Sequence, residues 1–210
     1  MSHYNFIIER STIVSDFSSQ VKGRIFLITG PSTGSVGAEI ALTLSRGYPS
    51  TTLLLGRSLP KIQPVIETID TISPSTVVKF VPLLLTSLAS IALPLKTILN
   101  DTFIPHIDIL IYNAGIMACP YERSEDGLES QWQMNSLSYF LLTNLLLPRR
   151  TNNKRLKPHA QSKTTNIIFS VELNRRLAKR GVEGFALHPG AIDTGLARHF
   201  ALEMLGEKFE

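Results

Sequence analysis

The most regular feature of the sequence is an alternation of short apolar runs with longer stretches in which apolar residues recur at helical spacing. Short apolar runs that end at glycine or at polar residues are typical of buried parallel strands. Apolar residues three and four positions apart are typical of helices that pack on a sheet. The predicted strands are residues 24–29, 51–55, 76–83, 107–112 and 184–187. The predicted helices are residues 37–46, 60–72, 87–99, 128–147 and 159 or 160 to 179, and the first twenty residues carry no regular pattern.

The order of these elements indicates the fold class. Strands that alternate with helices at this spacing predict an α/β protein with a doubly wound parallel sheet of Rossmann type. A length of 210 residues favours one domain over residues 1–210, since it is enough chain to bury one core. Residues 149–158 interrupt the pattern between the two long helices. This segment is too basic to form a buried strand, because burying its charges would cost several kcal/mol per ion.

Composition narrows the function classes. The formal net charge of +4 comes largely from that basic segment, which holds Arg149, Arg150, Lys154, Arg155 and Lys157 without interleaved aromatic residues. Such a charge run is typical of a solvated loop, so we expect no nucleic-acid partner. Cys119 is the only cysteine, which excludes an intramolecular disulfide, and no metal-ligand spacing is present. The uncharged stretch 80–95 is too short to span a bilayer, and the N-terminus lacks a signal-peptide pattern. We expect a soluble, cytoplasmic protein.

The strongest functional pattern is the glycine-rich loop 29–37 between the first predicted strand and the first helix. Gly30, Gly34 and Gly37 permit a tight turn and let an anion approach the backbone. Free N–H groups and the helix dipole then favour a pyrophosphate at this position. An ordinary strand-to-helix turn is the alternative interpretation of the loop taken by itself.

The loop resembles the T-G-x-x-x-G-x-G signature of the short-chain dehydrogenase/reductase family, with one extra residue and with Ser35 where a glycine is often found. Further motifs follow in the family's order: Gly37-Ala38-Glu39, Tyr112-Asn113-Ala114-Gly115, Met134-Asn135-Ser136, Gln161-Ser162-Lys163, His188-Pro189-Gly190 and Ile192-Asp193-Thr194. The resemblance covers about residues 20–200 apart from one gap. It implies a nicotinamide-dinucleotide cofactor, bound by Gly30, Ser32, Gly34, Val36, Gly37, Arg57, Asn113, Lys163, Ile192 and Thr194.

Arg57 decides which dinucleotide we expect. It follows the second predicted strand, where an acidic residue would bond the ribose hydroxyls of NAD. An arginine suits the 2′-phosphate of NADP, so the prediction is NADP, with NAD less favoured and an ordinary surface arginine as the alternative.

The sequence departs from the family pattern at the catalytic positions. The resemblance implies an active-site asparagine, Asn135, and a lysine, Lys163, but the tyrosine expected four residues before that lysine is His159. The serine expected at the end of a fifth strand is absent from residues 149–158. Leu84 stands where the family commonly has an aspartate, and the chain ends soon after Thr194. We therefore expect a sheet that lacks one central strand and the C-terminal strand.

These observations predict an NADP-dependent oxidoreductase that acts on a carbonyl or alcohol substrate, with Asn135, Lys163 and His159 as candidate catalytic residues. For His159, an exposed residue at a helix start is the simpler interpretation. Two alternatives stay open. The first is that the chain is a catalytically inactive relative that binds a dinucleotide or a protein. The second is that it is a truncated or mis-spliced product. The resemblance also implies that a homo-oligomer could form through the two long helices.

Overall fold

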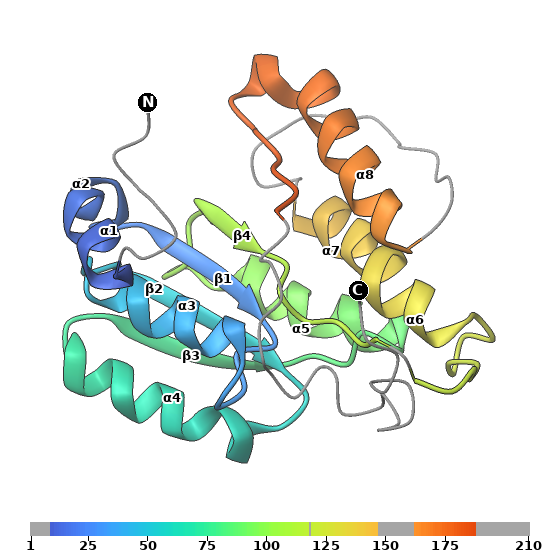
Figure 1. Ribbon diagram of the computed structural model, residues 1–210, viewed down its shortest axis with the longest axis horizontal. Coiled ribbons are helices and arrows are strands. Elements are labelled where there is room, and N and C mark those ends of the chain that lie inside the picture. The colour runs from blue at the N-terminus through green and yellow to red at the C-terminus, as the bar shows by residue number, and fades with distance from the viewer. Residues whose placement is uncertain (1–8, 118, 147–161, 188–210) are drawn as a thin grey trace, which may run out of the picture. The chain divides into compact units, whose positions relative to one another are not determined.

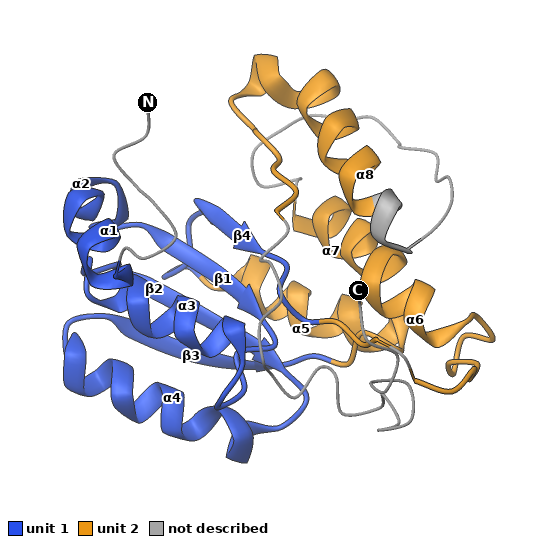
Figure 2. Ribbon diagram, in the orientation of Figure 1, with its two compact units in different colours: residues 1–83, 102–114 blue, residues 84–101, 115–210 orange. Residues whose placement is uncertain are grey.

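The computed structural model describes residues 9–117, 119–146 and 162–187. These residues fall into two compact units (Figure 2). Of the described residues, 9–83 and 102–114 form unit 1, and 84–101, 115–117, 119–146 and 162–187 form unit 2. The single domain expected from chain length stays a prediction.

Unit 1 is built on a four-stranded parallel sheet with the strand order β3-β2-β1-β4 (Figure 1). The strands are β1 (Ile25–Thr29), β2 (Thr51–Gly56), β3 (Val77–Pro82) and β4 (Ile109–Ile111). All three strand pairs are parallel, and Ile25 is in register with Thr51, which is in register with Val77. The sheet confirms the predicted α/β class and the first four predicted strands.

Helices α3 (Val36–Ser45) and α4 (Leu59–Ile72) cover one face of this sheet. Successive side chains of a strand point to opposite faces of the sheet, so every second residue points to this face. There these residues pack against the apolar stripes of both helices. The core cluster comprises Val21, Phe26, Ile28, Ala38, Ala41, Leu54, Ile62, Val65 and Ile69. All residues of β1 and the first five residues of β2 are buried, as expected for parallel strands in the interior of a sheet.

The N-terminal segment corrects one expectation. We expected no regular structure in the first twenty residues, but α1 (Arg10–Asp16) and α2 (Ser18–Val21) are helical. Each of these short helices buries a single valine, Val14 in α1 and Val21 in α2, so neither shows an apolar period in the sequence.

Unit 2 is helical. It contains α5 (Leu88–Asn100), α6 (Ser130–Trp132), a π-helical turn η1 (Gln133–Leu137), α7 (Ser138–Leu146), α8 (Ser162–Leu177) and a 3₁₀ turn η3 (Ala178–Arg180). The helix predicted for residues 87–99 is confirmed as α5 despite Pro94. The long helix predicted for residues 128–147 is a continuous run of α6, η1 and α7. No helix in the described part of the chain is both long and apolar enough to cross a membrane.

The strand predicted for residues 184–187 is wrong. After Gly181, which adopts a left-handed conformation with φ 68°, the chain continues without a strand as far as residue 187. The Asn174 side chain accepts a hydrogen bond from the Gly184 N–H (2.9 Å) and donates one to the Gly184 carbonyl (2.7 Å). These backbone groups are the ones that a strand ladder would use, so an asparagine takes the place of a neighbouring strand.

β4 is shorter than predicted, with three residues instead of the expected run 107–112. Among the described strands it pairs only with β1, and Ile109 remains partly exposed. The basic segment 149–158 lies outside the described residues, as do residues 188–210. The expected absence of a central and a C-terminal strand therefore stays a prediction.

Candidate functional site

The glycine-rich loop follows β1 at the carboxyl edge of the sheet in unit 1. The Gly30 N–H donates to the Leu55 carbonyl at the end of β2 (2.8 Å). The Thr33 N–H and hydroxyl both donate to the Lys61 carbonyl in the first turn of α4, at 2.9 and 3.0 Å. These bonds fix the loop to two neighbouring elements, so its backbone is held in place before any ligand arrives.

Two of the three loop glycines are required by close packing. A Cβ atom at Gly30 would lie 2.8 Å from the Ala114 Cβ, and one at Gly37 would lie 2.4 Å from the Asn113 Nδ2. Gly34 has a different reason, because its φ of +75° is in the left-handed region and a Cβ there would point into open space. The loop is thus close to Asn113 and Ala114 on one side and open at Gly34.

Ser35 caps the helix that follows the loop. Its hydroxyl accepts a hydrogen bond from the Ala38 N–H (3.1 Å) and donates one to the Gly30 carbonyl (3.1 Å). A serine at this position therefore ties the two ends of the loop together and satisfies one of the free donors of α3. This capping role of Ser35 was not predicted, although a serine directly before a helix is a recognisable N-cap signal.

Thr29 organises the turn that faces the loop, and sequence reasoning missed this role. Its buried hydroxyl accepts hydrogen bonds from the N–H groups of Asn113 and Ala114, both at 3.1 Å. The Asn113 side chain in turn donates to the carbonyls of Thr29 (3.1 Å) and Gly30 (3.2 Å). The ends of β1 and β4 are therefore locked together through one hydroxyl and one amide. The signal in the sequence is the threonine that ends an otherwise apolar strand.

The remaining predicted binding residues of unit 1 lie along the same edge of the sheet. Ser32 and Val36 are half-buried in the loop and in the first turn of α3. Arg57 is exposed directly after β2, which is the strand beside β1. The structure thus brings together the predicted residues Gly30, Ser32, Gly34, Val36, Gly37 and Asn113, with Arg57 at the end of the neighbouring strand.

Asn135 belongs to unit 2 and lies in the π-helical turn η1. It is buried, with its Oδ1 accepting from the Ile116 N–H (3.0 Å) and its Nδ2 donating to the Ile116 carbonyl (2.8 Å). A Cβ at Gly115 would lie 3.1 Å from the Asn135 Oδ1. Asn135 therefore braces the chain just after the Asn113-Ala114 turn, and its catalytic role stays a prediction. π-helical turns are frequent at functional sites.

Several predicted residues are not placed by the structure. His159, Ile192 and Thr194 lie outside the described residues. Lys163 lies in the first turn of α8, but its side chain is outside the described part. Leu84 is half-buried in unit 2, and its N–H donates to the Ser90 hydroxyl (3.1 Å). The residues described in the structure contain no cluster of three His, Cys, Asp or Glu side chains that could hold a metal.

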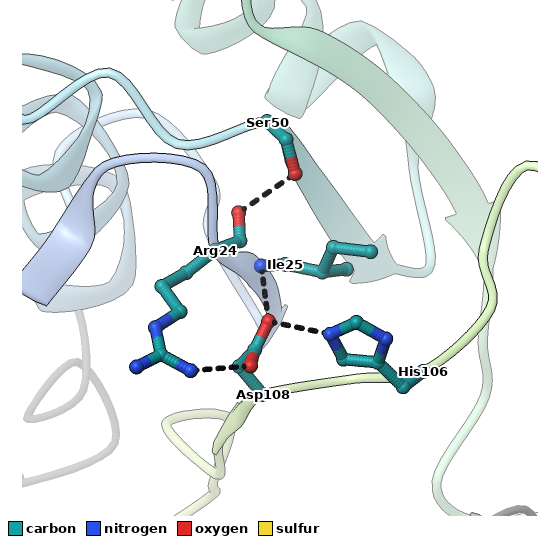
Figure 3. A network of polar contacts seen from close by, with 5 residues as sticks. All are labelled: Arg24, Ile25, Ser50, His106 and Asp108. Atoms are coloured by element: carbon teal, nitrogen blue, oxygen red, sulfur yellow. Dashed lines mark hydrogen bonds and ion pairs between the residues drawn. The ribbon is translucent and has the colours of Figure 1, made fainter.

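The charged network of unit 1 lies at the opposite, amino-terminal edge of the sheet (Figure 3). The buried Asp108 carboxylate accepts from the Ile25 N–H (2.9 Å) and the Arg24 guanidinium (2.8 Å), and His106 Nε2 lies 3.2 Å away. Burial pushes the pKa of Asp108 upward. The hydrogen bonds from Ile25 and Arg24, with the charges of His106 and Arg24, outweigh burial and hold this pKa below its usual value.

The geometry of the loop fits a bound pyrophosphate. An anion at this place would meet the amino-terminal end of α3, a helix of three turns, where the dipole and backbone N–H groups favour negative charge. Gly34 leaves open space at the loop surface, and Arg57 adds a cation at the end of β2. The arrangement can therefore hold a dinucleotide at the carboxyl edge of the parallel strands, where ligands of such sheets bind.

Comparisons with known proteins agree with this geometry. The family model described as short chain dehydrogenase matches residues 24–204. Human "Retinol dehydrogenase 11" is 33% identical over 86% of this chain and 64% of its own length, and human "Retinol dehydrogenase 13" is 34% identical over 85% and 62%. The chain thus spans less than two thirds of the length of these relatives.

Solved structures show the same fold. An uncharacterised protein from Mycobacterium paratuberculosis has a TM-score of 0.62 at 33% sequence identity, with 85% of this chain and 72% of that chain covered. A Pseudomonas syringae structure reaches a TM-score of 0.68 at 20% identity, with 90% and 82% covered, which is a likeness of fold alone.

Proposed function

Because the chain belongs to the short chain dehydrogenase family and is homologous to retinol dehydrogenases, we propose that it is an NADP-linked oxidoreductase. It interconverts a carbonyl group and the corresponding alcohol. The observation that carries the proposal is the glycine loop 30–37, which is fixed by Thr29, Ser35 and Asn113 into a cradle for a pyrophosphate. When bound, the dinucleotide supplies the hydride chemistry.

The preference for NADP rests on Arg57. This exposed guanidinium follows β2 at the edge where the loop lies, and in sheets of this kind that position faces the adenosine ribose. A guanidinium binds a phosphate through charge-assisted hydrogen bonds. Arg57 would therefore hold the 2′-phosphate that distinguishes NADP from NAD.

The proposed acid–base group is His159. In the resembled family pattern a tyrosine stands at this position, four residues before Lys163. An imidazole titrates near neutral pH and donates or accepts a proton at a substrate oxygen. In this role His159 protonates the carbonyl oxygen during reduction, and Asn135 and Lys163 position the reacting groups.

The substrate class follows from chemistry and homology. Two of the relatives carry the name retinol dehydrogenase, so a retinoid aldehyde or alcohol is the first substrate to test. Short aliphatic and aromatic aldehydes belong in the same panel, because the family chemistry requires only a carbonyl carbon that accepts a hydride.

The cofactor half of the proposal is tested by calorimetric titration of the purified protein with NADPH and NADH. We expect saturable NADPH binding that is at least about tenfold tighter than NADH binding. Arg57→Ala should weaken NADPH by about tenfold and leave NADH unchanged. The matched control is Arg46→Ala, an exposed arginine at the far end of α3. Equal loss in both variants, or no binding by a folded protein, would contradict the proposal.

The catalytic half is tested by following NADPH oxidation with the aldehyde panel. We expect His159→Ala to abolish turnover and His159→Tyr to retain or increase it, since a phenol restores the family's proton donor. NADPH binding without turnover in the wild type and in His159→Tyr would identify a non-catalytic dinucleotide-binding relative. The sequence feature that favours this second function is the absence of a serine from residues 149–158.

A further inference from the structure

Two exposed cations lie close together where β2 leads into α4. Arg57 directly follows β2, and Lys61 is the third residue of α4. Within the described part of the chain, neither side chain takes part in an ion pair. The first turn of α4 also contains no acidic residue that could balance them. Both charges are therefore available to an anion.

A lysine at the position of Lys61 is unfavourable for the helix itself. The positive end of the helix dipole repels a cation in the first turn. The third helical position is also the one at which glutamate or glutamine completes a capping box with a serine N-cap. Here the N-cap is Ser58, whose side chain makes no cap bond, and a lysine stands where the acidic partner would be. Residues that break a local rule of this kind are expected at functional sites, so Lys61 is a candidate for binding rather than for stability.

The backbone of Lys61 is held between the glycine loop and the end of β2. Its carbonyl accepts hydrogen bonds from the Thr33 N–H (2.9 Å) and hydroxyl (3.0 Å), so the loop lies beside the start of α4 (Figure 1). The next residue, Ile62, is fully buried against the end of β2, where a Cβ atom at Gly56 would lie 2.7 Å from the Ile62 Cδ1. The lysine is thus carried by a rigid backbone at the edge of the proposed dinucleotide site.

The helix geometry directs the Lys61 side chain toward Arg57. In an α-helix each Cα–Cβ bond is tilted toward the amino-terminal end, so the lysine leans back over the turn that leaves β2. The Lys61 N–H donates to the Ser58 carbonyl (3.2 Å), which closes this turn, and the half-exposed Ser58 hydroxyl is not used as a cap. One turn of chain therefore presents a guanidinium, a hydroxyl and an ammonium group.

We propose that Lys61 is a second cation for the 2′-phosphate of NADP and thereby a residue that determines dinucleotide specificity. This inference rests on the proposed function, in which Arg57 faces the adenosine ribose. A phosphate monoester carries a charge of about −1.5 to −2 at pH 7, so a single guanidinium leaves part of it unbalanced. The Lys61 ammonium supplies the remaining charge, and the Ser58 hydroxyl donates a further hydrogen bond. NAD has a hydroxyl group in place of this phosphate and gains no ion pair from Lys61.

The test is calorimetric titration of the full chain and its Lys61 variants with NADPH, NADH and 2′,5′-ADP. Lys61→Met keeps the length of the side chain and removes its charge. We expect it to weaken NADPH and 2′,5′-ADP about tenfold and to leave NADH unchanged. Lys61→Glu should bind NADPH more weakly than NADH, because a carboxylate then faces the phosphate. Lys61→Arg, which keeps the charge, should retain the preference for NADPH.

Two further variants locate the effect. Arg57→Ala combined with Lys61→Met should bind NADPH no more tightly than NADH, because both cations of the phosphate site are gone. The matched control is Lys22→Met, which changes an exposed lysine before β1, at the opposite edge of the sheet, and should leave all three affinities unchanged. Thermal melts verify that each variant folds.

The outcomes separate this inference from the proposed function. Unchanged NADPH affinity in Lys61→Met would show an ordinary surface lysine, and equal weakening of NADPH and NADH would place Lys61 at the pyrophosphate. Either result overturns the inference, and the proposed function stands as long as Arg57→Ala still weakens NADPH alone. No NADPH binding by the folded wild type would overturn both.

Discussion

At the scale of single residues, a few polar side chains set the geometry of unit 1. Thr29 and Asn113 lock the carboxyl ends of β1 and β4 with bonds of 3.1–3.2 Å, and Asp108 anchors the opposite ends of the same two strands. Each of these groups is buried or half-buried and satisfied by backbone atoms. A satisfied buried polar group stabilises one arrangement, because every alternative leaves a backbone donor without a partner.

Asp108→Asn tests this role. The variant keeps an oxygen for the Ile25 N–H but loses the charge that Arg24 and His106 face, so we expect the free energy of unfolding at pH 7 to fall by about 1–2 kcal/mol. Urea denaturation measures this difference. Asp70→Asn, which changes an exposed carboxylate of α4, is the control and should have little effect.

The lowered pKa of Asp108 also predicts how the stability difference between wild type and Asp108→Asn depends on pH. A carboxyl group whose pKa is lower in the folded state stabilises the protein above its unfolded pKa, here the ordinary value of 3.8. This stabilisation is lost as the pH falls through the folded pKa below that value. The difference between wild type and Asp108→Asn should therefore shrink as the pH falls below about 5. A difference that does not change down to the acid unfolding transition would contradict the assignment.

At the scale of elements, α3 and α4 begin in different ways although both follow a serine. Ser35 accepts the Ala38 N–H at the start of α3, whereas Ser58 at the start of α4 makes no side-chain cap bond. α4 has a proline in its first turn, which needs no donor partner and fits the helical φ. The helix next to the glycine loop is thus the one whose start depends on a hydroxyl.

Ser35→Ala should lower the free energy of unfolding by about 1 kcal/mol, since it removes the cap of α3 and the bond to the Gly30 carbonyl. Ser58→Ala is a matched control with the same chemical change at a helix start, and it should alter stability by only a few tenths of a kcal/mol. Chemical denaturation of the wild type, Ser35→Ala and Ser58→Ala measures the two changes in the free energy of unfolding. Equal effects of the two substitutions would show that the Ser35 hydroxyl does not cap the helix.

The same elements show what the sequence could predict. The first four strands and the helices α3, α4 and α5 followed from apolar period and glycine position, because buried strands and packed helices leave a strong pattern. α1 and α2 were missed, since each buries a single valine. The strand expected at residues 184–187 failed because Asn174 binds the backbone of Gly184, a contact that no local pattern reveals.

The candidate site was predictable to a similar degree. The glycines and Asn113 were found from the motif, and the structure places them together in unit 1. The brace that Asn135 forms with Ile116 joins residues 19 positions apart, and the Thr29 bonds join residues more than 80 apart. Such partners are set by tertiary packing, so a sequence can name the residues but not the bonds.

At the scale of the whole molecule, individual elements differ in how far they are buried. In unit 1, every residue of β1 is buried, and α4 buries Ile62, Val65 and Ile69 in the core cluster. In unit 2, α8 leaves three apolar side chains exposed, those of Ile167, Ile168 and Val171. Local opening requires the least free energy where few apolar contacts are lost. Stability should therefore be distributed unevenly along the chain.

Native-state hydrogen exchange tests this distribution. We expect amides of β1 and β2 to exchange at least about a hundredfold more slowly than those of Ile167–Leu177 in α8, a difference of about 2.7 kcal/mol in opening free energy. Helix α4 is the internal control, because it is a helix like α8 but packs on the core. If α4 is protected and α8 is not, burial rather than helical structure sets the difference. Equal protection of α8 and β1 would mean that the exposed face of α8 is covered in solution.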